Sequence, residues 1–277
     1  MTSPDSRINP YRSDIAAEHL RGIVDAPSYV VGVPLTLYHG IAVLHKEPDT
    51  LAEQVSVMRY GDVFTVYEST EQWLWGQCAR DGYVGYTVNQ GFFDQPLNPT
   101  HRIKKSHSFL FPEPSIKKVP MDTLTFLSGV EVEETDGKFS KLKGGGFIHA
   151  HHLTPMAEWA ERDIVFTAGR FLGIPYLWGG NTSLGLDCSG LVQIACEAAG
   201  IACPRDSDMQ AASLGQPVND HDKLHRGDFV FFQGHVGIMT DPANLLHANA
   251  YHGCVVVEPL ADVVARGSAV TIVRRLT

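Results

Sequence analysis

The sequence predicts an α+β protein in which two small β-barrels precede a larger domain of helices and sheet. Three observations predict this class. Residues 31–98 contain short alternating apolar runs between glycine turns, and residues 99–154 repeat the same order. Residues 155–277 instead show one or two helices followed by a series of strands. Residues 1–30 form an N-terminal segment for which no fold is predicted.

The first barrel is predicted from runs in which apolar and polar side chains alternate, as they do in half-buried strands. These runs cover residues 41–44, 54–58, 62–67 and 72–76. Gly61, Asp81-Gly82 and Gly85 are expected to mark turns between them. Many short strands with close turn signals are typical of a small barrel.

The second barrel is predicted from an internal repeat. Residues 121–132 mirror residues 54–65, because in both copies an alternating strand meets a glycine turn and continues as another alternating strand. The segment that precedes this unit is also repeated, with residues 107–114 in the place of 39–44. Residues 147–149 then close the second copy. A repeat at this spacing predicts two similar barrels.

The last domain begins where the strand pattern stops. Thr154 is a predicted helix N-cap with Pro155 at the first helical position, and this helix is expected to end at Gly173. A second helix is predicted from Cys188 to Ala199, with Gly200 as its stop. Strands are predicted over residues 229–232, 235–240, 245–250, 255–258 and 270–273.

Composition excludes several classes of function. The chain of 277 residues has a formal net charge of -9, which argues against nucleic acid as a partner. It has no run of about 18 apolar residues, so no membrane span or membrane partner is expected. Five cysteines do not form a disulfide framework, and the first residues lack a secretory pattern. Cytoplasmic residence is therefore expected, although a mature chain whose signal had been removed would look the same. The oligomeric state stays open.

One cysteine has the position of a nucleophile. Cys188 follows Asp187, a good N-cap, and so lies in the first turn of a predicted helix, where the helix dipole favours a thiolate. The glycines of the preceding loop, Gly179 and Gly180, allow a substrate backbone to approach closely. The other cysteines lie in apolar or strand-like sequence and are interpreted as buried small hydrophobic residues. These are Cys78, Cys196, Cys203 and Cys254.

A cysteine nucleophile needs a base, and two histidines have suitable spacing. The turn signal Asp241-Pro242-Ala243 lies midway between two predicted strands. A symmetric hairpin centred on it places His235 opposite His247, with Cβ atoms about 5 Å apart. His247 would then orient His235, as the third member of a triad does. The alternative is that both are ordinary strand histidines at the surface.

Five other histidines could suggest a metal site, but their spacing does not support one. They lack the paired cysteines or the His-Glu-x-x-His helix of metal sites, so a polar linker is the better interpretation. No metal and no cofactor are expected. The sequence also has no Gly-x-Ser-x-Gly elbow and no phosphate-binding glycine loop. The histidines concerned are His149, His151, His152, His221 and His225.

Several segments together resemble the NlpC family of bacterial cell-wall peptidases. They occur in the order of the family and extend from about Trp159 to the C-terminus. The resemblance implies a papain-like fold with Cys188, His235 and His247 as the catalytic residues, and it implies SH3-like barrels before that domain. The matching segments are residues 175–180 (PYLWGG), 186–192 (LDCSGLV), 226–232 (RGDFVFF), 234–238 (GHVGI) and 247–248 (HA).

The resemblance also implies a substrate. Family members with two SH3-like barrels are γ-D-glutamyl-L-diamino-acid endopeptidases that recycle murein stem peptides with a free N-terminal L-Ala. Asp187 would hold the substrate ammonium, assisted by Glu53 and Tyr83 (or Tyr86) of the first barrel. Arg205 and its neighbours would line the pocket of the γ-D-Glu carboxylate. The residues expected to bind substrate are Asp187, Ser189, Glu53, Tyr83, Tyr86, Trp178, Arg205, Asp206 and Ser207.

The mechanism expected on this basis is acyl transfer. The Cys188 thiolate attacks the γ-glutamyl carbonyl, the backbone N–H of Cys188 contributes to the oxyanion hole, and His235 protonates the leaving amine. Two alternatives stay open at this stage. One is an acyltransferase or amidase on the same fold, and the other is a catalytically inactive protein that binds the cell wall.

Overall fold

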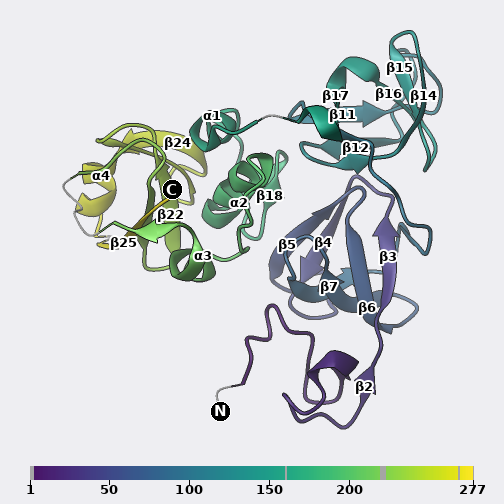
Figure 1. Ribbon diagram of the computed structural model, residues 1–277, viewed down its shortest axis with the longest axis horizontal. Coiled ribbons are helices and arrows are strands. Elements are labelled where there is room, and N and C mark those ends of the chain that lie inside the picture. Colours follow the sequence, from purple (N-terminus) through teal and green to yellow (C-terminus); the bar gives the residue numbers. More distant parts are fainter. Residues whose placement is uncertain (1–2, 160, 219–222, 268, 277) are drawn as a thin grey trace. The chain divides into compact units, whose positions relative to one another are not determined.

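The computed structural model describes residues 3–159, 161–218, 223–267 and 269–276. The chain divides into two compact units, residues 1–159 (the N-terminal unit) and residues 160–277 (the C-terminal unit) (Figure 1). The regular secondary structure of the N-terminal unit consists mainly of strands, whereas the C-terminal unit combines helices with one larger sheet.

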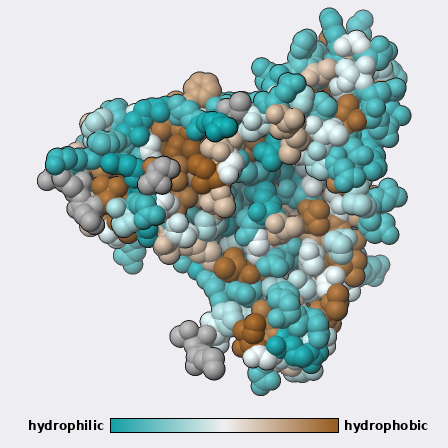
Figure 2. Space-filling view, in the orientation of Figure 1, coloured by the Kyte–Doolittle hydropathy of each residue, from teal (hydrophilic) through white to brown (hydrophobic). Residues whose placement is uncertain are grey.

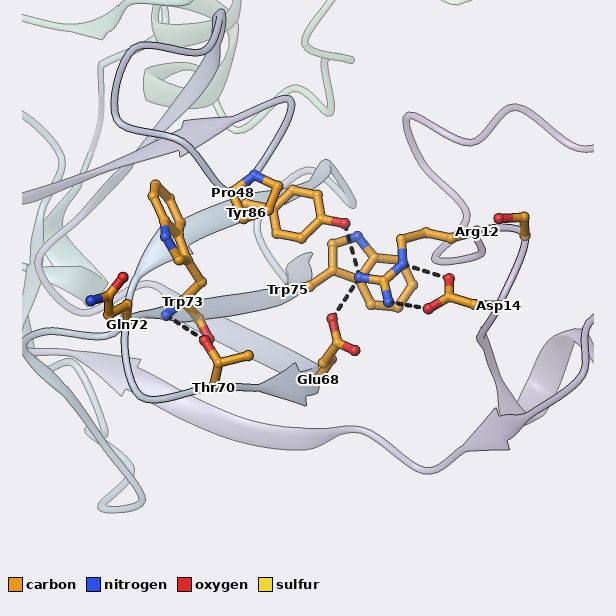
Figure 3. A pocket seen from close by; sticks show the side chains of 10 residues that line it. Arg12, Asp14, Pro48, Glu68, Thr70, Gln72, Trp73, Trp75 and Tyr86 are labelled. Carbon is orange, nitrogen blue, oxygen red and sulfur yellow. Dashed lines mark hydrogen bonds and ion pairs between the residues drawn. The ribbon is translucent and has the colours of Figure 1, made fainter.

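Residues 3–30 of the N-terminal segment are attached to the first barrel. It contains a short parallel pair, β1 (Ala16–Ala17) and β2 (Tyr29–Val30), and the 3-10 helix η1 (Glu18–Leu20). The Arg12 guanidinium lies 4.5 Å from the ring centre of Trp75 and donates to Glu68 at 2.7 Å and to the Tyr86 hydroxyl at 2.8 Å (Figure 3). A cation stacked on an indole and paired with a carboxylate explains why this segment stays on the barrel.

The first barrel is a seven-stranded sheet in the order β5-β4-β8-β7-β6-β3-β9. The four predicted runs are all strands, which confirms the period-two pattern. Gly85 was expected in a turn but lies inside a strand opposite Gly76, since both are small residues where strands pack closely. The strands are β3 (Val33–Leu37), β4 (Ile41–His45), β5 (Gln54–Arg59), β6 (Val63–Ser69), β7 (Trp73–Cys78), β8 (Val84–Val88) and β9 (Phe92–Phe93).

The second barrel consists of three small antiparallel sheets, β13-β10-β17, β11-β12 and β14-β15-β16. Inward side chains such as Ile103, Leu124 and Ile148 form its core, and its visible outer face is mostly hydrophilic (Figure 2). Its elements are β10 (His101–Ile103), β11 (His107–Leu110), β12 (Asp122–Thr125), β13 (Gly129–Val130), β14 (Val132–Asp136), β15 (Phe139–Leu142), β16 (Phe147–His149), η2 (Ala150–His152), β17 (Leu153–Pro155) and η3 (Met156–Glu158).

Two glycines allow the barrels of the N-terminal unit to meet. The backbone N–H of Gly40 donates to Asp122 Oδ2 at 2.7 Å. Gly61 has φ 86° and lies so close to Gly129 that a Cβ atom there would collide with the Gly129 carbonyl oxygen. Tyr60, next to it, is buried in the core of the second barrel. The two barrels therefore share packing rather than standing apart on a linker.

The C-terminal unit is built on a six-stranded sheet in the order β20-β25-β21-β22-β23-β24. Helix α2 packs against β22 and β23, and also against α1. The elements are α1 (Ile164–Gly169), β18 (Asn181–Thr182), β19 (Gly185–Leu186), α2 (Cys188–Ala198), α3 (Ser207–Ser213), β20 (Gln216–Pro217), β21 (Phe229–Phe232), β22 (His235–Met239), β23 (Asn244–Asn249), β24 (Cys254–Pro259), α4 (Leu260–Ala265) and β25 (Val270–Arg275).

The predicted helix at Thr154 is wrong. Thr154 lies in strand β17, which pairs with β10 of the second barrel, so its backbone groups are used in a sheet. The helix begins at Ile164 instead, where Asp163 caps it by accepting from the N–H groups of Val165 and Phe166. Trp159, expected on that helix, packs against Phe126 of the second barrel with ring centres 5.8 Å apart. The border between the units therefore falls after residue 159 rather than after 154.

Helix α2 confirms the predicted helix from Cys188, and all five predicted strands of this unit are present within two residues of their expected limits. Helices α3 and α4 were not predicted, because each has only six or seven residues and no long apolar repeat. None of the helices that the structure describes is long and apolar enough to cross a membrane.

Candidate active site

Cys188 is the first residue of helix α2. Asp187 has extended backbone (φ -91°, ψ 179°) and caps the helix by accepting from Gly190 N at 2.7 Å. The Cys188 side chain is largely buried, and the backbone N–H groups of Val236 and Ser189 donate toward its sulfur. Because Val236 directly follows His235 on β22, this contact brings the thiol to the start of the strand that carries the predicted base.

The helix dipole was expected to favour a Cys188 thiolate, but the pKa of this thiol is shifted in the opposite direction. Burial raises the pKa of Cys188 to about 12, and the negative charge of Asp187 acts in the same direction. The two backbone N–H groups oppose this shift but do not overcome it. Burial also lowers the pKa of His235 to about 4, so burial favours the neutral thiol and the neutral imidazole as the resting forms.

The two predicted histidines meet. His235 Nε2 and His247 Nδ1 are 2.7 Å apart, and the ring centres are 5.0 Å apart. The predicted register is nevertheless wrong by two residues, since Ile238 pairs with Leu246 rather than with residue 244. The Asp241 side chain accepts hydrogen bonds from the backbone N–H groups of Ala243 and Asn244, and the centre of the turn lies one residue later than predicted. The histidines are diagonal neighbours, which long side chains can still bridge.

Behind His247 lies a residue that sequence reasoning missed. His247 Nε2 is 2.8 Å from Glu258 Oε1, and Arg266 binds the same carboxylate at 2.8 and 2.6 Å. The hydrogen bond from Arg266 is the main cause of a lowered Glu258 pKa, to about 2. Glu258 lies on β24, and β24 pairs with β23. A predicted strand over residues 255–258 with one acidic residue was the available signal, but its face could not be assigned.

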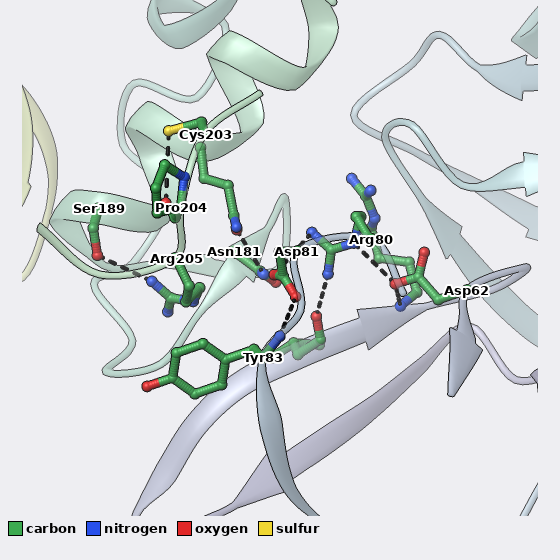
Figure 4. A network of polar contacts seen from close by, with 12 residues as sticks. Asp62, Arg80, Asp81, Tyr83, Asn181, Ser189, Cys203, Pro204 and Arg205 are labelled. Carbon is green, nitrogen blue, oxygen red and sulfur yellow. Dashed lines mark hydrogen bonds and ion pairs between the residues drawn. The ribbon is translucent and has the colours of Figure 1, made fainter. Parts of the chain in front are cut away.

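The predicted substrate residues Asp187, Ser189 and Arg205 form one buried polar cluster. Arg205 Nη1 donates to Asp187 Oδ1 and to Ser189 Oγ, both at 3.0 Å, and Nη2 binds Asp187 Oδ2. Figure 4 shows the contact between Arg205 and Ser189. Asp187 also accepts from Gly179 N at 2.9 Å. The structure therefore uses these groups to hold the helix start and the loop together. Their predicted roles toward a substrate ammonium and carboxylate stay predictions.

The other predicted residues of this unit lie around the cluster. Asp206 is the N-cap residue of α3 and Ser207 is its first residue. Trp178 is 58% exposed in the loop before β18. Tyr176 was noted in the sequence only as part of the matching segment 175–180. Burial raises its pKa to about 12, and the charges of Cys188 and Asp187 add to that shift. Tyr176 is therefore a neighbour of the nucleophile.

The three residues predicted on the first barrel make different contacts. Glu53 forms an ion pair with Lys46 at 3.3 Å. Tyr83 is buried, and its backbone N–H donates to Asp81 at 3.1 Å (Figure 4). Tyr86 lines a cavity of about 600 Å³ and accepts from Arg12, so its hydroxyl is engaged by the N-terminal segment (Figure 3). Their contacts with substrate stay predictions.

The histidine group of the second barrel is a stacked cluster. The rings of His149 and His152 stack with centres 5.0 Å apart, and His152 Nδ1 is 2.7 Å from Ser108 Oγ. Among the residues that the structure describes, no three His, Cys, Asp or Glu side chains are arranged to hold a metal ion. His221 lies outside the described residues.

Comparison with known proteins agrees with the resemblance seen in the sequence. The model of the NlpC/P60 family matches residues 173–273, and the model of the bacterial dipeptidyl-peptidase Sh3 domain matches residues 44–88. The γ-D-glutamyl-L-lysine dipeptidyl-peptidase of Bacillus subtilis (strain 168) is 32% identical over 167 residues, covering 56% of this chain and 55% of the relative. This chain thus spans little more than half of that relative.

A second relative is matched over most of its length. Dipeptidyl-peptidase 6 of Lysinibacillus sphaericus is 30% identical over 234 residues, covering 76% of this chain and 85% of the relative. The crystal structure of an NlpC/P60 family protein from Bacillus cereus ATCC 10987 has a TM-score of 0.74 at 20% identity, covering 87% of this chain and 99% of that one. The predicted fold class is confirmed. By these matches, the chain belongs to the NlpC/P60 family of cysteine peptidases.

Proposed function

We propose that this protein is a cysteine endopeptidase that hydrolyses the γ-D-glutamyl-L-diamino-acid bond of murein peptides and releases L-Ala-D-Glu. The observation that carries the proposal is the arrangement at the start of α2. The buried Cys188 thiol accepts from Val236 N, next to His235, which is hydrogen-bonded to His247 at 2.7 Å. Two relatives named for the γ-D-glutamyl-L-lysine bond support this choice of bond.

The resting pair is neutral, so proton transfer accompanies attack. His235 takes the thiol proton as the Cys188 sulfur forms a bond to the γ-glutamyl carbonyl carbon. His235 then gives that proton to the leaving amine of the diamino acid, and a thioester remains. Water, deprotonated by His235, attacks the thioester, releases the dipeptide carboxylate and restores the thiol. Backbone N–H groups at the start of α2, including that of Cys188, stabilise the oxyanion.

The substrate is proposed to have a free amino terminus. The relatives are named dipeptidyl-peptidases, and a dipeptidyl-peptidase removes two residues from an amino terminus. Because the Bacillus relatives are named for L-lysine, L-lysine and diaminopimelate are the two leaving groups to compare.

Mass spectrometry of synthetic peptides tests the proposal. L-Ala-γ-D-Glu-L-Lys, its diaminopimelate counterpart and the N-acetylated forms of both are incubated with wild-type and Cys188→Ala protein. We expect L-Ala-D-Glu only from wild type and only from the free-amino peptides. Intact peptides in every sample would overturn the proposed bond, and equal cleavage of the N-acetylated forms would overturn the amino-terminal requirement.

We also propose a role in recycling murein peptides within the cytoplasm. None of the five cysteines, all of which lie within the described residues, is in a disulfide. Cysteines without disulfides are typical of a reducing compartment. Fractionation of the source cells, with the protein detected by antibody, tests this: recovery in the external fraction would contradict it.

A further inference from the structure

The carboxylate of Glu258 lies at the end of a hydrogen-bonded chain that begins at the nucleophile's base. His235 Nε2 meets His247 Nδ1 at 2.7 Å, and His247 Nε2 meets Glu258 Oε1 at 2.8 Å. The Glu258 side chain is 11% exposed, and that of His247 is 1% exposed. We propose that Glu258 is a positioning residue that sets the tautomers of both histidines and leaves His235 Nδ1 as the free base. This inference rests on the proposed function for its rate measurement only.

The tautomers follow from the charge of Glu258. Arg266 holds the carboxylate by two hydrogen bonds, of 2.8 and 2.6 Å, and keeps it ionised. An ionised carboxylate has no proton, so His247 must donate from Nε2. Neutral His247 then has its lone pair on Nδ1, and His235 must donate to it from Nε2. The lone pair of neutral His235 is left on Nδ1, the nitrogen available to take the thiol proton.

One contact competes with this assignment. Asn249 Nδ2 is 2.7 Å from His247 Nε2, and it could donate there only if His247 carried its proton on Nδ1. That arrangement would place a lone pair of His247 against the charged Glu258 oxygen at 2.8 Å. Asn249 has another acceptor, since its Nδ2 is 3.2 Å from Glu258 Oε1. The charged acceptor therefore decides the tautomer.

The orientation of Asn249 is itself fixed. Its Oδ1 accepts from His252 N at 2.7 Å, which turns Nδ2 toward the carboxylate. His252 Nε2 lies 3.3 Å from Glu258 Oε2. The titratable or charged groups facing Glu258 among the described residues are thus His247, His252 and Arg266, and each of them can donate to it.

The hydrogen-bonded chain also explains how the neutral His247 can support His235 as a base. When His235 takes the thiol proton it becomes a cation, and His247 alone offers only a lone pair. Glu258 adds a negative charge one residue further along the chain, so that His247 and Glu258 together do what one carboxylate does in a Ser-His-Asp triad. No proton needs to leave His247 for this.

Substitution of Glu258 by glutamine separates the tautomer role from packing. The side chain keeps its shape, but its amide can donate to His247 Nε2 and so favour the proton on Nδ1. His235 must then accept at Nε2 and carry its own proton on Nδ1, so the lone pair proposed for the base is lost. Because a wrong tautomer costs about 10⁴-fold in a serine protease triad, we expect kcat to fall by at least roughly 10²-fold with KM little changed.

The experiment has a readout that does not depend on the substrate. Histidine-selective ¹⁵N labelling and long-range ¹H–¹⁵N spectra report which ring nitrogen carries the proton at pH 7. In wild type we expect His235 and His247 both protonated on Nε2, and in Glu258→Gln a shift of His247 toward Nδ1. The matched control is Glu71→Gln, the same chemical change on an exposed side chain of the N-terminal unit; its spectra, kcat and thermal midpoint should equal those of wild type.

Each outcome either supports or overturns the proposed role of Glu258. Wild-type His235 protonated on Nδ1 would overturn the proposal, as would unchanged tautomers and kcat in Glu258→Gln. A fall in kcat that followed only a lower thermal midpoint, with unchanged ring-nitrogen shifts, would reduce Glu258 to a packing residue. If Glu258→Gln failed to fold, the wild-type spectrum alone would still test the tautomers. Correct tautomers without peptide cleavage would contradict the proposed function and leave this inference intact.

Discussion

The Asp187 carboxylate and the Arg205 guanidinium form a two-point ion pair in which the Arg205 side chain is only 1% exposed. Arg205 Nη1 donates to Oδ1 at 3.0 Å, and Nη2 binds Oδ2. The same carboxylate caps helix α2 through Gly190 N. One side chain thus fixes both the helix that begins with Cys188 and the loop that carries Arg205, and it neutralises a buried cation.

We expect Asp187→Asn to destabilise the C-terminal unit by about 3–5 kcal/mol, because it leaves the buried Arg205 charge without its partner. Asp163 offers a matched control, since it caps α1 and pairs with Arg226 at 2.9 Å but is 45% exposed. Asp163→Asn should cost less than about 1 kcal/mol. Urea unfolding of both variants measures the difference in the free energy of unfolding. Equal losses of this free energy would show that burial does not increase the contribution of the ion pair.

The pH dependence of thiol alkylation tests the neutral resting pair. The pKa of Cys188 is raised to about 12 and that of His235 is lowered to about 4, both chiefly by burial. The thiolate fraction should then increase about tenfold for each pH unit between pH 6 and 9, and the rate of iodoacetamide labelling should follow it. Peptide mapping after timed labelling isolates Cys188 from the other thiols. A rate plateau from pH 5 to 8 would instead reveal a preformed thiolate–imidazolium pair.

The histidine pair should make the C-terminal unit sensitive to mild acid. The folded pKa of His235 is lowered from 6.5 to about 4, and that of His247 is also lowered by burial. The unfolded chain therefore binds more protons between these limits, so stability is complete above about pH 6.5 and is lost as the pH falls toward 4. His235 alone accounts for about 3 kcal/mol of this loss.

Thermal midpoints measured from pH 4 to 8 check this expectation. His235→Gln should flatten the decline below pH 6.5, whereas His19→Gln, which removes an exposed histidine, should leave the curve unchanged. Glu258 acts in a lower window, since its pKa is lowered from 4.5 to about 2 and its contribution is lost only below about pH 4.5. An unaltered slope in His235→Gln would contradict the assignment.

Local patterns predicted the parts of this protein whose contacts are local. The cap Asp187 and the stop Gly200 bracket α2 correctly, because both act on the backbone within one turn. The alternating runs of the first barrel became strands for the same reason. Thr154 and Pro155 carried a similar helix signal, but a partner strand 52 residues earlier, at Arg102, took their backbone groups instead. The spacing of residues in the sequence does not show that a distant strand would compete with the helix for these backbone groups.

The site shows the same division. Cys188 could be chosen from its place after a cap, and His235 and His247 from a turn halfway between them. The chain that continues to Glu258 could not be foreseen, because it depends on which face of β24 meets β23 and on Arg266 in a helix that has no sequence signal. The burial that raises the thiol pKa was equally hidden, since the helix dipole argued in the opposite direction.

The contact between the two barrels of the N-terminal unit gives the last prediction. Gly61 has φ 86°, and a methyl group there would also collide with the Gly129 carbonyl. Gly137 has φ 57° with nothing within 4 Å of an added Cβ, so Gly137→Ala measures the backbone strain alone, about 1–2 kcal/mol. Gly61→Ala should lower the calorimetric midpoint of this unit markedly more, because Gly129 cannot move without disturbing β13 and its partner β10. Equal shifts for the two variants would mean that the barrels separate at little cost and that Gly61 serves its own turn only.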